Sequence, residues 1–401
     1  MMKRFPGMMG VFFLAGGLPA ALPAVSQAGG LQGSWSQLAP YPTNITNNAV
    51  TSVCQGGSCT IYSFMGMTQP NNTASVTAAS YKLESPGTGP WIQIADAPLL
   101  NGKAKIAASA VVCGGNIYLL GGYTIGGPEV TEPRLFRYDN ATDTYIQLAD
   151  VPTEVDDTVT AVYQDRYIYL MSGWHGPINS NTQAVQVYDT QTDTWQQATP
   201  IPVAGRFGHT GGAVGDRLVF IDGSIAAGQF PIVHTTVVGT IDPADVAAIN
   251  WTIPAPSPFS QTYRAAGSQG TQPCDRVIFV GGTNNPYNFN GTGYNGQPAN
   301  PLDQVMTYDP VADAWSLVDD SFGVAHGPTM DHRGLVYFNG AWVTVGGMRG
   351  PNIPTNAVNA LTIDGLCASA AIPTTSEWGV VIMVLLMLVV AGRTVLHPRH
   401  N

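Results

Sequence analysis

Seven polar or aromatic side chains of this 401-residue chain are spaced so that they could meet at one ligand site. Each follows a tryptophan or tyrosine by 11 to 14 residues, which predicts equivalent loop positions around one mouth. Arginine binds carboxylate or sugar-acid groups through its two-pronged guanidinium, and tyrosine offers a face for stacking. The expected ligand is therefore polar, such as a sugar or a peptide. The seven residues are Lys105, Asp156, Arg206, His209, Tyr263, Arg264 and His326.

Four of these residues, Arg206, Tyr263, Arg264 and His326, are expected to converge in one pocket. A catalytic carboxylate there would need a perturbed pKa. No motif links a carboxylate to the arginines, so we predict binding without turnover and assign no catalytic residue. Replacing Arg206 and Arg264 by alanine should then abolish ligand capture and leave the melting temperature nearly unchanged. The alternative is that these are ordinary solvated loop residues.

Six aromatic residues that recur 50 to 64 residues apart set the frame for these positions. A glycine or a pair of small residues follows each of them after 27 to 32 residues. The runs between these marks are short, β-branched and aromatic, and turn residues bound them, which is strand composition. No stretch of sequence between residues 30 and 368 has a convincing helical apolar period, so helix should be scarce. The six aromatics are Trp35, Trp91, Tyr145, Trp195, Trp251 and Trp315.

Four short strands per unit, glycine pairs and a closing aromatic together resemble the kelch repeat of β-propellers over residues 31–366. The resemblance implies an all-β, six-bladed kelch-type β-propeller. The sixth unit lacks a closing aromatic strand, so the N-terminal strand around Trp35 should complete it and close the ring. In three copies a Tyr-Asp pair precedes the aromatic at a fixed spacing. These copies are Tyr138 to Tyr145, Tyr188 to Trp195 and Tyr308 to Trp315.

Propellers of this family place two sets of loops on one face: those joining strand four to strand one, and those joining strand two to strand three. The longest interruption of the repeats, Thr283 to Leu302, mixes aromatic residues with asparagine and glycine, and we interpret it as a binding loop. A disordered insertion is the alternative. Three repeated aspartate pairs resemble Ca²⁺ ligands but are interpreted as turn caps. These pairs are Asp139 and Asp143, Asp189 and Asp193, and Asp309 and Asp313.

Some kelch-type propellers are enzymes, which gives a second hypothesis. A galactose-oxidase-like copper site is disfavoured, because His209 and His326 are more than two units apart and Cys113 has no obvious tyrosine partner. A resemblance to sialic-acid mutarotases stays open, since Arg206 and Arg264 could bind a sugar acid. The chain has no Gly-x-Ser-x-Gly motif, no CxxC pair and no His-x-His cluster. We therefore expect neither a metal nor a cofactor.

Residues 1–28 have the pattern of a secretory signal peptide. Lys3 and Arg4 precede an apolar stretch from Met8 to Ala21, and Ser26 to Ala28 form a small-residue cleavage site. Cleavage would leave a mature chain starting at Gly29. A buried apolar strand is the alternative interpretation.

Residues 369–401 carry a motif, the apolar run Val380 to Gly392 and a basic end. This order resembles the C-terminal sorting signals of Gram-negative bacteria that exosortase-type membrane proteases recognise, although Thr375 stands where leucine is usual. The resemblance implies transient anchorage in the inner membrane, then the cell surface or the extracellular space. An ordinary tail anchor is the alternative. The matching residues are Ile372, Pro373, Thr374, Ser376, Glu377, Trp378 and Gly379.

Composition narrows the partners and the compartment. Only 10% of residues are charged and the net charge is −10, which argues against nucleic acid as a partner. Five cysteines in an exported chain predict disulfides, first between Cys54 and Cys59. The pairing of Cys113, Cys274 and Cys367 stays open, with a bridge between the last two only weakly favoured.

Residues 29–368 are therefore expected to form one propeller domain between the signal peptide and the sorting segment. We predict an exported, surface-sorted interaction protein that recognises a protein or a glycan on its loop face. The alternative is an extracytoplasmic carbohydrate-active enzyme of kelch type. Propellers host both kinds of function, so the fold by itself does not choose between them.

Overall fold

The computed structural model describes residues 30–268, 274–323 and 326–366, and these residues form an all-β structure as predicted. Helix is limited there to two short 3₁₀ turns, η1 (Thr73–Ser75) and η2 (Gly176–Ile178). Within the described ranges, no helix has the length and apolar character needed to cross a membrane. The predicted signal peptide and the sorting motif lie outside the described residues.

Four sheets contain four antiparallel strands each. The first consists of β2 (Ala49–Gln55), β3 (Ser58–Phe64), β6 (Ser80–Glu84) and β7 (Ile92–Ile94). The second consists of β8 (Ile106–Cys113), β9 (Asn116–Tyr123), β10 (Phe136–Asp139) and β11 (Thr144–Gln147). The third consists of β12 (Val159–Tyr163), β13 (Tyr167–His175), β14 (Ser180–Asp189) and β15 (Thr194–Ala198). The fourth consists of β16 (Thr210–Val214), β17 (Arg217–Ile221), β18 (Thr236–Asp242) and β19 (Asp245–Thr252).

A fifth sheet joins eight strands, and the first described strand of the chain lies inside it. Strand β1 pairs antiparallel with β26 and parallel with β23. In sheet order the strands are β20 (Ala266–Gly267), β21 (Val277–Val280), β22 (Val305–Asp309), β23 (Ala314–Gly323), β1 (Leu31–Gln37), β26 (Val358–Ile363), β25 (Ala341–Val345) and β24 (Val336–Phe338). A small ribbon of β4 (Gly66–Met67) and β5 (Val76–Thr77) completes the strands.

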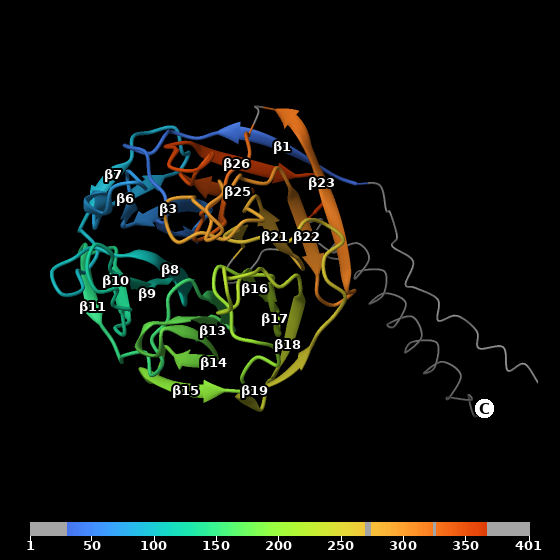
Figure 1. The fold of residues 1–401 in the computed structure, drawn as a ribbon. Helices are drawn as coiled ribbons and strands as arrows, with labels where there is room; N and C mark the ends of the chain where they lie inside the picture. Colours follow the sequence, from blue (N-terminus) through green and yellow to red (C-terminus); the bar gives the residue numbers. More distant parts are fainter. Residues whose placement is uncertain (1–29, 269–273, 324–325, 367–401) are drawn as a thin grey trace, which may run out of the picture.

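The sheets stand around a common centre (Figure 1); each four-stranded sheet directs one edge inward, and the eight-stranded sheet directs both of its edges, β20 and β24, inward. The inward strands contact one another: β2 with β8 and β24, and β12 with β8 and β16. Two parallel bridges add to these contacts. One joins Ser268, next to β20, to Leu335, next to β24, and the other joins Ala49 of β2 to Arg333, which precedes β24. We call β2, β8, β12, β16, β20 and β24 the inner strands.

The apolar core lies between neighbouring sheets. In its largest cluster, Tyr169 and Met171 of β13 pack with Leu218 and Phe220 of β17, and all four are almost completely buried. Successive side chains of a strand point to opposite faces of the sheet. The remaining apolar side chains of these strands therefore pack in the cluster on the other face, and each sheet has two apolar faces. Burial on both faces explains why the second strand of each unit reads as a continuous apolar run.

Four of the six recurring aromatics connect their unit to the preceding one by a side-chain hydrogen bond. The ring N–H or hydroxyl donates to a backbone carbonyl that lies four residues after the preceding aromatic in the sequence. This bond gives a physical reason for the repeat, because the donor must reach a fixed point on the neighbouring unit. The four bonds run from Trp91 to Ala39 at 3.0 Å, Tyr145 to Ala95 at 2.9 Å, Trp195 to Ala149 at 2.9 Å and Trp251 to Thr199 at 3.0 Å.

The repeated aspartate pairs are turn caps, which confirms the sequence interpretation. In the best example, Asp189 Oδ1 accepts from the backbone N–H of Gln191 at 2.9 Å. Asp193 Oδ1 accepts from the Tyr188 hydroxyl at 2.7 Å and from the backbone N–H of Ala149 at 2.9 Å. Both carboxylates therefore satisfy local donors. The equivalent tyrosine bonds are Tyr138 to Asp143 at 2.7 Å and Tyr308 to Asp313 at 2.8 Å.

The cysteines in the described residues have different states. Cys54 and Cys59 are register partners in the β2–β3 hairpin and form a disulfide. Cys113 is free and buried, and burial raises the pKa of its thiol to about 12, so it is an inert core residue. Cys274 is disulfide-bonded. Cys367 lies outside the described residues.

Candidate functional site

A ring of six turn residues surrounds the centre, one at the start of each inner strand or just before it. All six have a left-handed backbone, with φ between 49° and 69°. The residue before each one bridges to the residue that follows the glycine mark of the same unit, as Asp156 does with Trp174 and Tyr263 with Thr283. We call these six the ring residues: Asn47, Ala107, Asp157, Gly208, Arg264 and Asp331.

The glycine marks of the sequence are explained by the close packing behind this ring. A Cβ on Gly282 would lie 2.0 Å from Thr262 Oγ1, and a Cβ on Gly281 would lie 2.1 Å from the Thr329 carbonyl oxygen. The Gly282 N–H instead donates to that carbonyl at 3.0 Å, across to the next unit. Only glycine permits this approach. The recurring glycines therefore lie at the positions where the turns that carry the site pack closely against neighbouring backbone.

Backbone hydrogen bonds link successive ring residues. For four of the six, the backbone N–H donates to the carbonyl of the ring residue in the preceding unit, which fixes the positions of these turns relative to one another. These bonded turns therefore leave little conformational freedom to the backbone that carries the side chains. The printed bonds run from Asp157 to Ala107 at 3.3 Å, Gly208 to Asp157 at 3.2 Å, Arg264 to Gly208 at 2.8 Å and Asp331 to Arg264 at 3.1 Å.

Four charged side chains meet at the ring and balance one another. Arg264 forms an ion pair with Asp157 through Nη2, and its Nη1 lies 3.3 Å from Asp331 Oδ1. Arg333 Nη2 lies 2.7 Å from Asp157 Oδ1, and Arg333 Nη1 lies 3.4 Å from Asp331 Oδ1. The contact between Arg333 and Asp157 is an ion pair without hydrogen-bond geometry. We call these four residues the central network.

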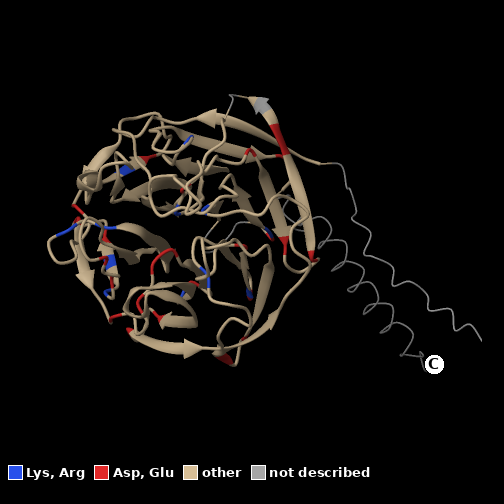
Figure 2. Ribbon diagram, in the orientation of Figure 1, with Lys and Arg blue, Asp and Glu red and all other residues tan. Residues whose placement is uncertain are grey.

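Burial and pairing act in opposite directions on the central arginine. Arg264 and Asp331 are almost fully buried, with 2% and 0% of their surfaces exposed. Burial lowers the pKa of Arg264, but the carboxylate of Asp157, followed by Tyr263 and Asp331, raises it well above its ordinary value. Asp331 Oδ2 also accepts from Thr46 Oγ1 at 2.6 Å. The four buried ions are therefore paired, as buried ions must be, while Arg264 Nε and Arg333 Nε have no hydrogen-bond partner among the described residues. Charged residues are sparse elsewhere on the ribbon (Figure 2).

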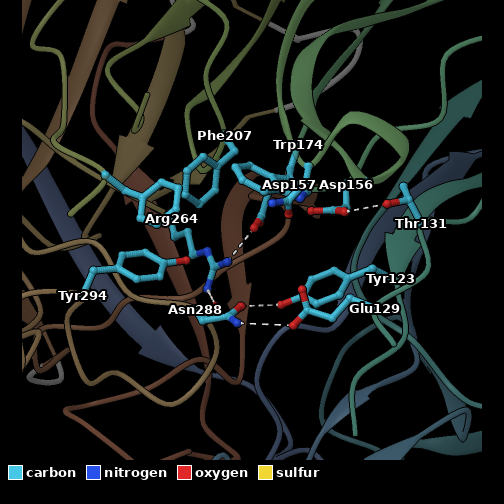
Figure 3. Close-up of a pocket in the computed structure, with 13 residues that line it drawn as sticks. Tyr123, Glu129, Thr131, Asp156, Asp157, Trp174, Phe207, Arg264, Asn288 and Tyr294 are labelled. Carbon is cyan, nitrogen blue, oxygen red and sulfur yellow. Dashed lines mark hydrogen bonds and ion pairs between the residues drawn. The ribbon is translucent and has the colours of Figure 1, made fainter. Parts of the chain in front are cut away.

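A cavity of about 260 Å³ opens beside the central network (Figure 3). Its lining residues all lie in the two sets of connections that the resemblance placed on one face, or at the strand ends flanking them. Among the thirteen are aromatic, acidic, amide and hydroxyl side chains. The lining residues are Tyr123, Glu129, Thr131, Asp156, Asp157, Trp174, Gly176, Asn179, Phe207, Phe230, Arg264, Asn288 and Tyr294.

One wall of the cavity is aromatic. Trp174 meets Phe207 edge-on with ring centres 5.6 Å apart, and Phe230 lies 5.8 Å from Trp174. Tyr294 continues this wall, with its ring centre 4.4 Å from that of Phe230. Behind them Tyr263 packs edge-on against Phe207 at 5.6 Å. These contacts hold the rings in place, so the cavity offers a pre-formed apolar surface.

The rest of the cavity lining is polar: Tyr123, Glu129 and Asn288 lie across from Trp174, and Asp156 lies beside it (Figure 3). The Tyr123 hydroxyl donates to Asn288 Oδ1 at 2.7 Å, and Asn288 Nδ2 donates to Glu129 Oε1 at 3.5 Å. Asp156 Oδ2 accepts from Thr131 Oγ1 at 3.2 Å. Burial, followed by the neighbouring charge of Asp157, raises the pKa of Asp156 well above its ordinary value. The proton on Asp156 is therefore sensitive to whatever occupies the cavity.

The connection between β21 and β22, which contains the Thr283 to Leu302 segment, reaches across the mouth. Its Asn288 carbonyl accepts from Arg264 Nη1, and its Tyr287 is fully buried. Phe289 packs against a cluster that includes Tyr123 of the second sheet. Asn288 and Tyr294 line the cavity. The segment thus contributes two lining residues to the cavity, and its role as a binding loop stays a prediction.

Two of the seven predicted residues, Asp156 and Arg264, line this cavity. The expected convergence of Arg206, Tyr263, Arg264 and His326 in one pocket is wrong for this cavity. Tyr263 lies behind Arg264, with its hydroxyl donating to the Tyr287 carbonyl at 2.8 Å. His326 instead stacks on Trp35, with ring centres 3.8 Å apart.

The other three predicted residues are also structural. Arg206 is buried, donates to the Asp222 carbonyl at 2.9 Å, and has its pKa lowered to about 10 by burial. His209 contacts the Met171 carbonyl at 2.8 Å through Nε2. Lys105 forms a buried ion pair with Glu132 at 2.5 Å. Equal spacing after an aromatic therefore selects buried loop residues as readily as cavity residues, because side-chain direction changes at every step along a turn.

Sequence reasoning missed Asp331 and Arg333 of the central network and the aromatic wall. The spacing from the closing aromatic failed in the last unit because β23 is ten residues long, which places the ring residue later in the sequence. Trp174 directly follows Gly173, at the point that bridges to the residue preceding Asp157. Phe207 directly precedes the ring residue Gly208.

Comparison with known proteins agrees with this architecture. Residues 158–202 match the Kelch motif. The chain is 26% identical over 252 residues to "Kelch-like protein terF" of Aspergillus terreus, covering 60% of this chain and 52% of that protein. It is 27% identical over 134 residues to human "Kelch-like protein 25", covering 33% of this chain and 22% of that protein. The chain therefore spans about half or less of the curated relatives it matches.

A solved structure, "Structure of YjhT", superposes with a TM-score of 0.63 at 17% identity. The alignment covers 82% of this chain and 98% of that one. At this identity the likeness concerns the fold alone. Together with the Kelch motif and the kelch-like relatives, it supports a kelch-repeat β-propeller.

Proposed function

We propose that this protein is an exported binding protein that recognises a sugar unit of a glycan in the cavity at its loop face. The observation that carries the proposal is the pairing of an aromatic wall, Trp174, Phe207, Phe230 and Tyr294, with a polar wall. A sugar ring has apolar C–H faces and a polar rim of hydroxyls. Concave sites with apolar walls and a few placed polar groups suit such a ligand.

The alternative function, a carbohydrate-active enzyme, is supported by one observation. Asp156, with its raised pKa, stands directly before Asp157, which is ion-paired to Arg264 and Arg333. Two carboxyls whose environments differ in this way can act as acid and base. Binding is favoured because Asp157 is engaged by two arginines and is not free to act on a substrate.

Two specific versions of the enzyme hypothesis are disfavoured by side-chain placement. A sialic-acid-mutarotase-like site needs a cation for the sugar carboxylate, and Arg264 already serves Asp157, Asp331 and the Asn288 carbonyl. A galactose-oxidase-like site needs its histidines together, and His209 and His326 are held by separate structural contacts.

The proposal includes a six-bladed propeller in which β1 completes the last blade. Its support is the placement of β1 between β26 and β23, together with the contact of β24 with β2. An N-terminal strand inserted in this way holds the two ends of the array together and leaves no open sheet edge there.

Export and surface sorting belong to the same proposal and rest on the two terminal segments of the sequence. We predict that protein isolated from its native host starts at Gly29 and lacks Val380 to Asn401. Intact-mass measurement checks both ends. A mass that retains Val380 to Asn401 would leave an ordinary tail anchor in place of the sorting signal.

The binding function is tested by removing the aromatic wall. We predict that Trp174→Ala weakens glycan capture at least about tenfold, since loss of an aromatic contact removes on the order of 1.5 kcal/mol. A glycan array screen followed by calorimetry on its best ligand measures the effect. Ile253→Ala is the control, because this side chain is 54% exposed and follows the outer strand β19. Unchanged affinity of the Trp174 variant would show that the cavity is not the site.

A further inference from the structure

We propose that the cavity selects a positively charged sugar unit, a protonated amino sugar, over neutral and anionic sugars. This inference rests on the proposed glycan-binding function and assigns its ligand class. Three observations support it: the cavity has more acidic than basic lining residues, its aromatic rings face no cation among the described residues, and Arg264 is already paired with carboxylates.

The cavity has an excess of carboxylates. Among its thirteen lining residues, Glu129, Asp156 and Asp157 are acidic and Arg264 is basic. The central network is already balanced, because two arginines share two aspartates, Asp157 and Asp331. Glu129 and Asp156 are left over. A ligand cation would therefore enter a site with carboxylates on its polar wall.

The environment of Asp156 is suited to respond to a cation. Its carboxyl is 3% exposed and accepts one hydrogen bond from Thr131 Oγ1. Burial and then the charge of Asp157 disfavour its ionised form, the hydrogen bond from Thr131 and the charge of Arg264 favour that form, and Glu129 disfavours it least. An ammonium group bound beside it would stabilise the carboxylate. Binding should then release a proton from Asp156 to the buffer.

The aromatic wall strengthens the same preference. Cations are attracted to the faces of aromatic rings, most strongly to tryptophan. Arg264 already lies over two rings, Tyr263 at 4.9 Å and Tyr287 at 5.0 Å, and neither ring lines the cavity. The cavity rings, Trp174 and Tyr294 among them, are thus positioned to receive a cation from the ligand.

An anionic sugar meets the opposite situation. Its carboxylate would face Glu129 and Asp156, and the only lining cation, within the part of the chain that the structure describes, is Arg264. Both Nη atoms of Arg264 are engaged, Nη2 by Asp157 and Nη1 by Asn288 and Asp331. Recognition of a sugar acid would require breaking a buried ion pair.

The test compares three β-1,4-linked tetrasaccharides that differ only at carbon 2: glucosamine, N-acetylglucosamine and glucose. Calorimetry on the full chain at pH 6 should give at least about tenfold tighter binding of the glucosamine tetramer. Tetralysine is added as a source of ammonium groups without a sugar. The apparent enthalpy for the glucosamine tetramer should change between buffers of different ionisation enthalpy, because a proton is released.

Variants assign the preference to the cavity. Asp156→Asn combined with Glu129→Gln should remove the tenfold preference, so that within this variant the glucosamine and glucose tetramers bind with affinities equal to within about twofold. Glu154→Gln is the matched control, since Glu154 lies two residues before Asp156 and does not line the cavity. It removes one negative charge from the same loop and should keep the preference.

Each outcome has a distinct meaning. Equal affinity for the three sugars overturns the charge preference and leaves glycan binding intact. Binding of none of the sugars overturns the proposed function itself, and tight binding of tetralysine alone shows that the cavity recognises charge without a sugar. A preference that survives in the Asp156 and Glu129 double variant overturns the assignment to these two carboxylates.

Discussion

Arg264→Ala should lower the free energy of unfolding by about 3 to 5 kcal/mol, because it leaves buried carboxylates without a full set of cations. In wild type, two arginines share Asp157 and Asp331, and all four groups are buried. The variant keeps only Arg333 for both aspartates. It also removes the donor to the Asn288 carbonyl that holds the β21–β22 connection. Denaturant unfolding measures the change.

A matched control separates this effect from the loss of any surface arginine. Arg276 lies 3.9 Å from Asp309 and its side chain is 29% exposed. Arg276→Ala should therefore change the unfolding free energy by less than about 1 kcal/mol. Similar values for the two variants would contradict a structural role for the central network. The expected loss for Arg264→Ala also replaces the expectation, based on spacing alone, of an unchanged melting temperature.

Acidification from pH 7 to pH 5 should reduce the free energy of unfolding by about 4 kcal/mol, through two buried histidines. His209 and His332 are 5% and 4% exposed, and burial lowers the pKa of each from 6.5 to about 3. Between these values the unfolded chain binds one more proton per histidine than the folded chain does. Stability therefore falls as the pH drops below 6.5, by about 2.7 kcal/mol per pH unit for the pair.

Two other groups act with the opposite sign. The pKa of Asp156 is raised by burial and by Asp157, so its contribution grows as the pH falls through its folded value. The pKa of His234 is raised by its hydrogen bond to Asp222, and its contribution is fully present below 6.5. A third histidine, His326, has its pKa lowered by burial from 6.5 to about 4, and it acts in the same direction as His209 and His332.

Urea unfolding at pH 7, 6 and 5 measures this dependence. His209→Gln is the informative variant, because its amide can still donate to the Met171 carbonyl that His209 contacts at 2.8 Å. It should lower the slope by about 1.4 kcal/mol per pH unit. A slope equal to that of wild type would show that His209 does not stay neutral in the folded protein.

The sequence by itself determined the repeat, the strand content and the face that carries the site. Four of the six aromatics share one structural role, because each of these four donates to a carbonyl of the preceding unit, as Trp195 does to Ala149. The glycines recur because a Cβ would collide with the backbone or with a neighbouring side chain, as at Gly281 and Gly282. Such local steric and hydrogen-bond requirements repeat at a fixed period, so a reader of the sequence can find them. The disulfide-bonded pair Cys54 and Cys59 is equally local, since the two residues face each other in one hairpin.

The tertiary structure alone decided which loop side chains meet. Arg206 and Arg264 occupy similar positions after their aromatics, yet only Arg264 has the left-handed turn that brings its side chain to the central network. One residue of displacement along a turn redirects a side chain, and the ten-residue strand β23 shifts the last turn of the ring. The partners in the central network are also far apart in sequence: Asp157 and Arg264 are separated by 107 residues. Spacing within one unit contains no information about such contacts, because they depend on how the units pack around the centre.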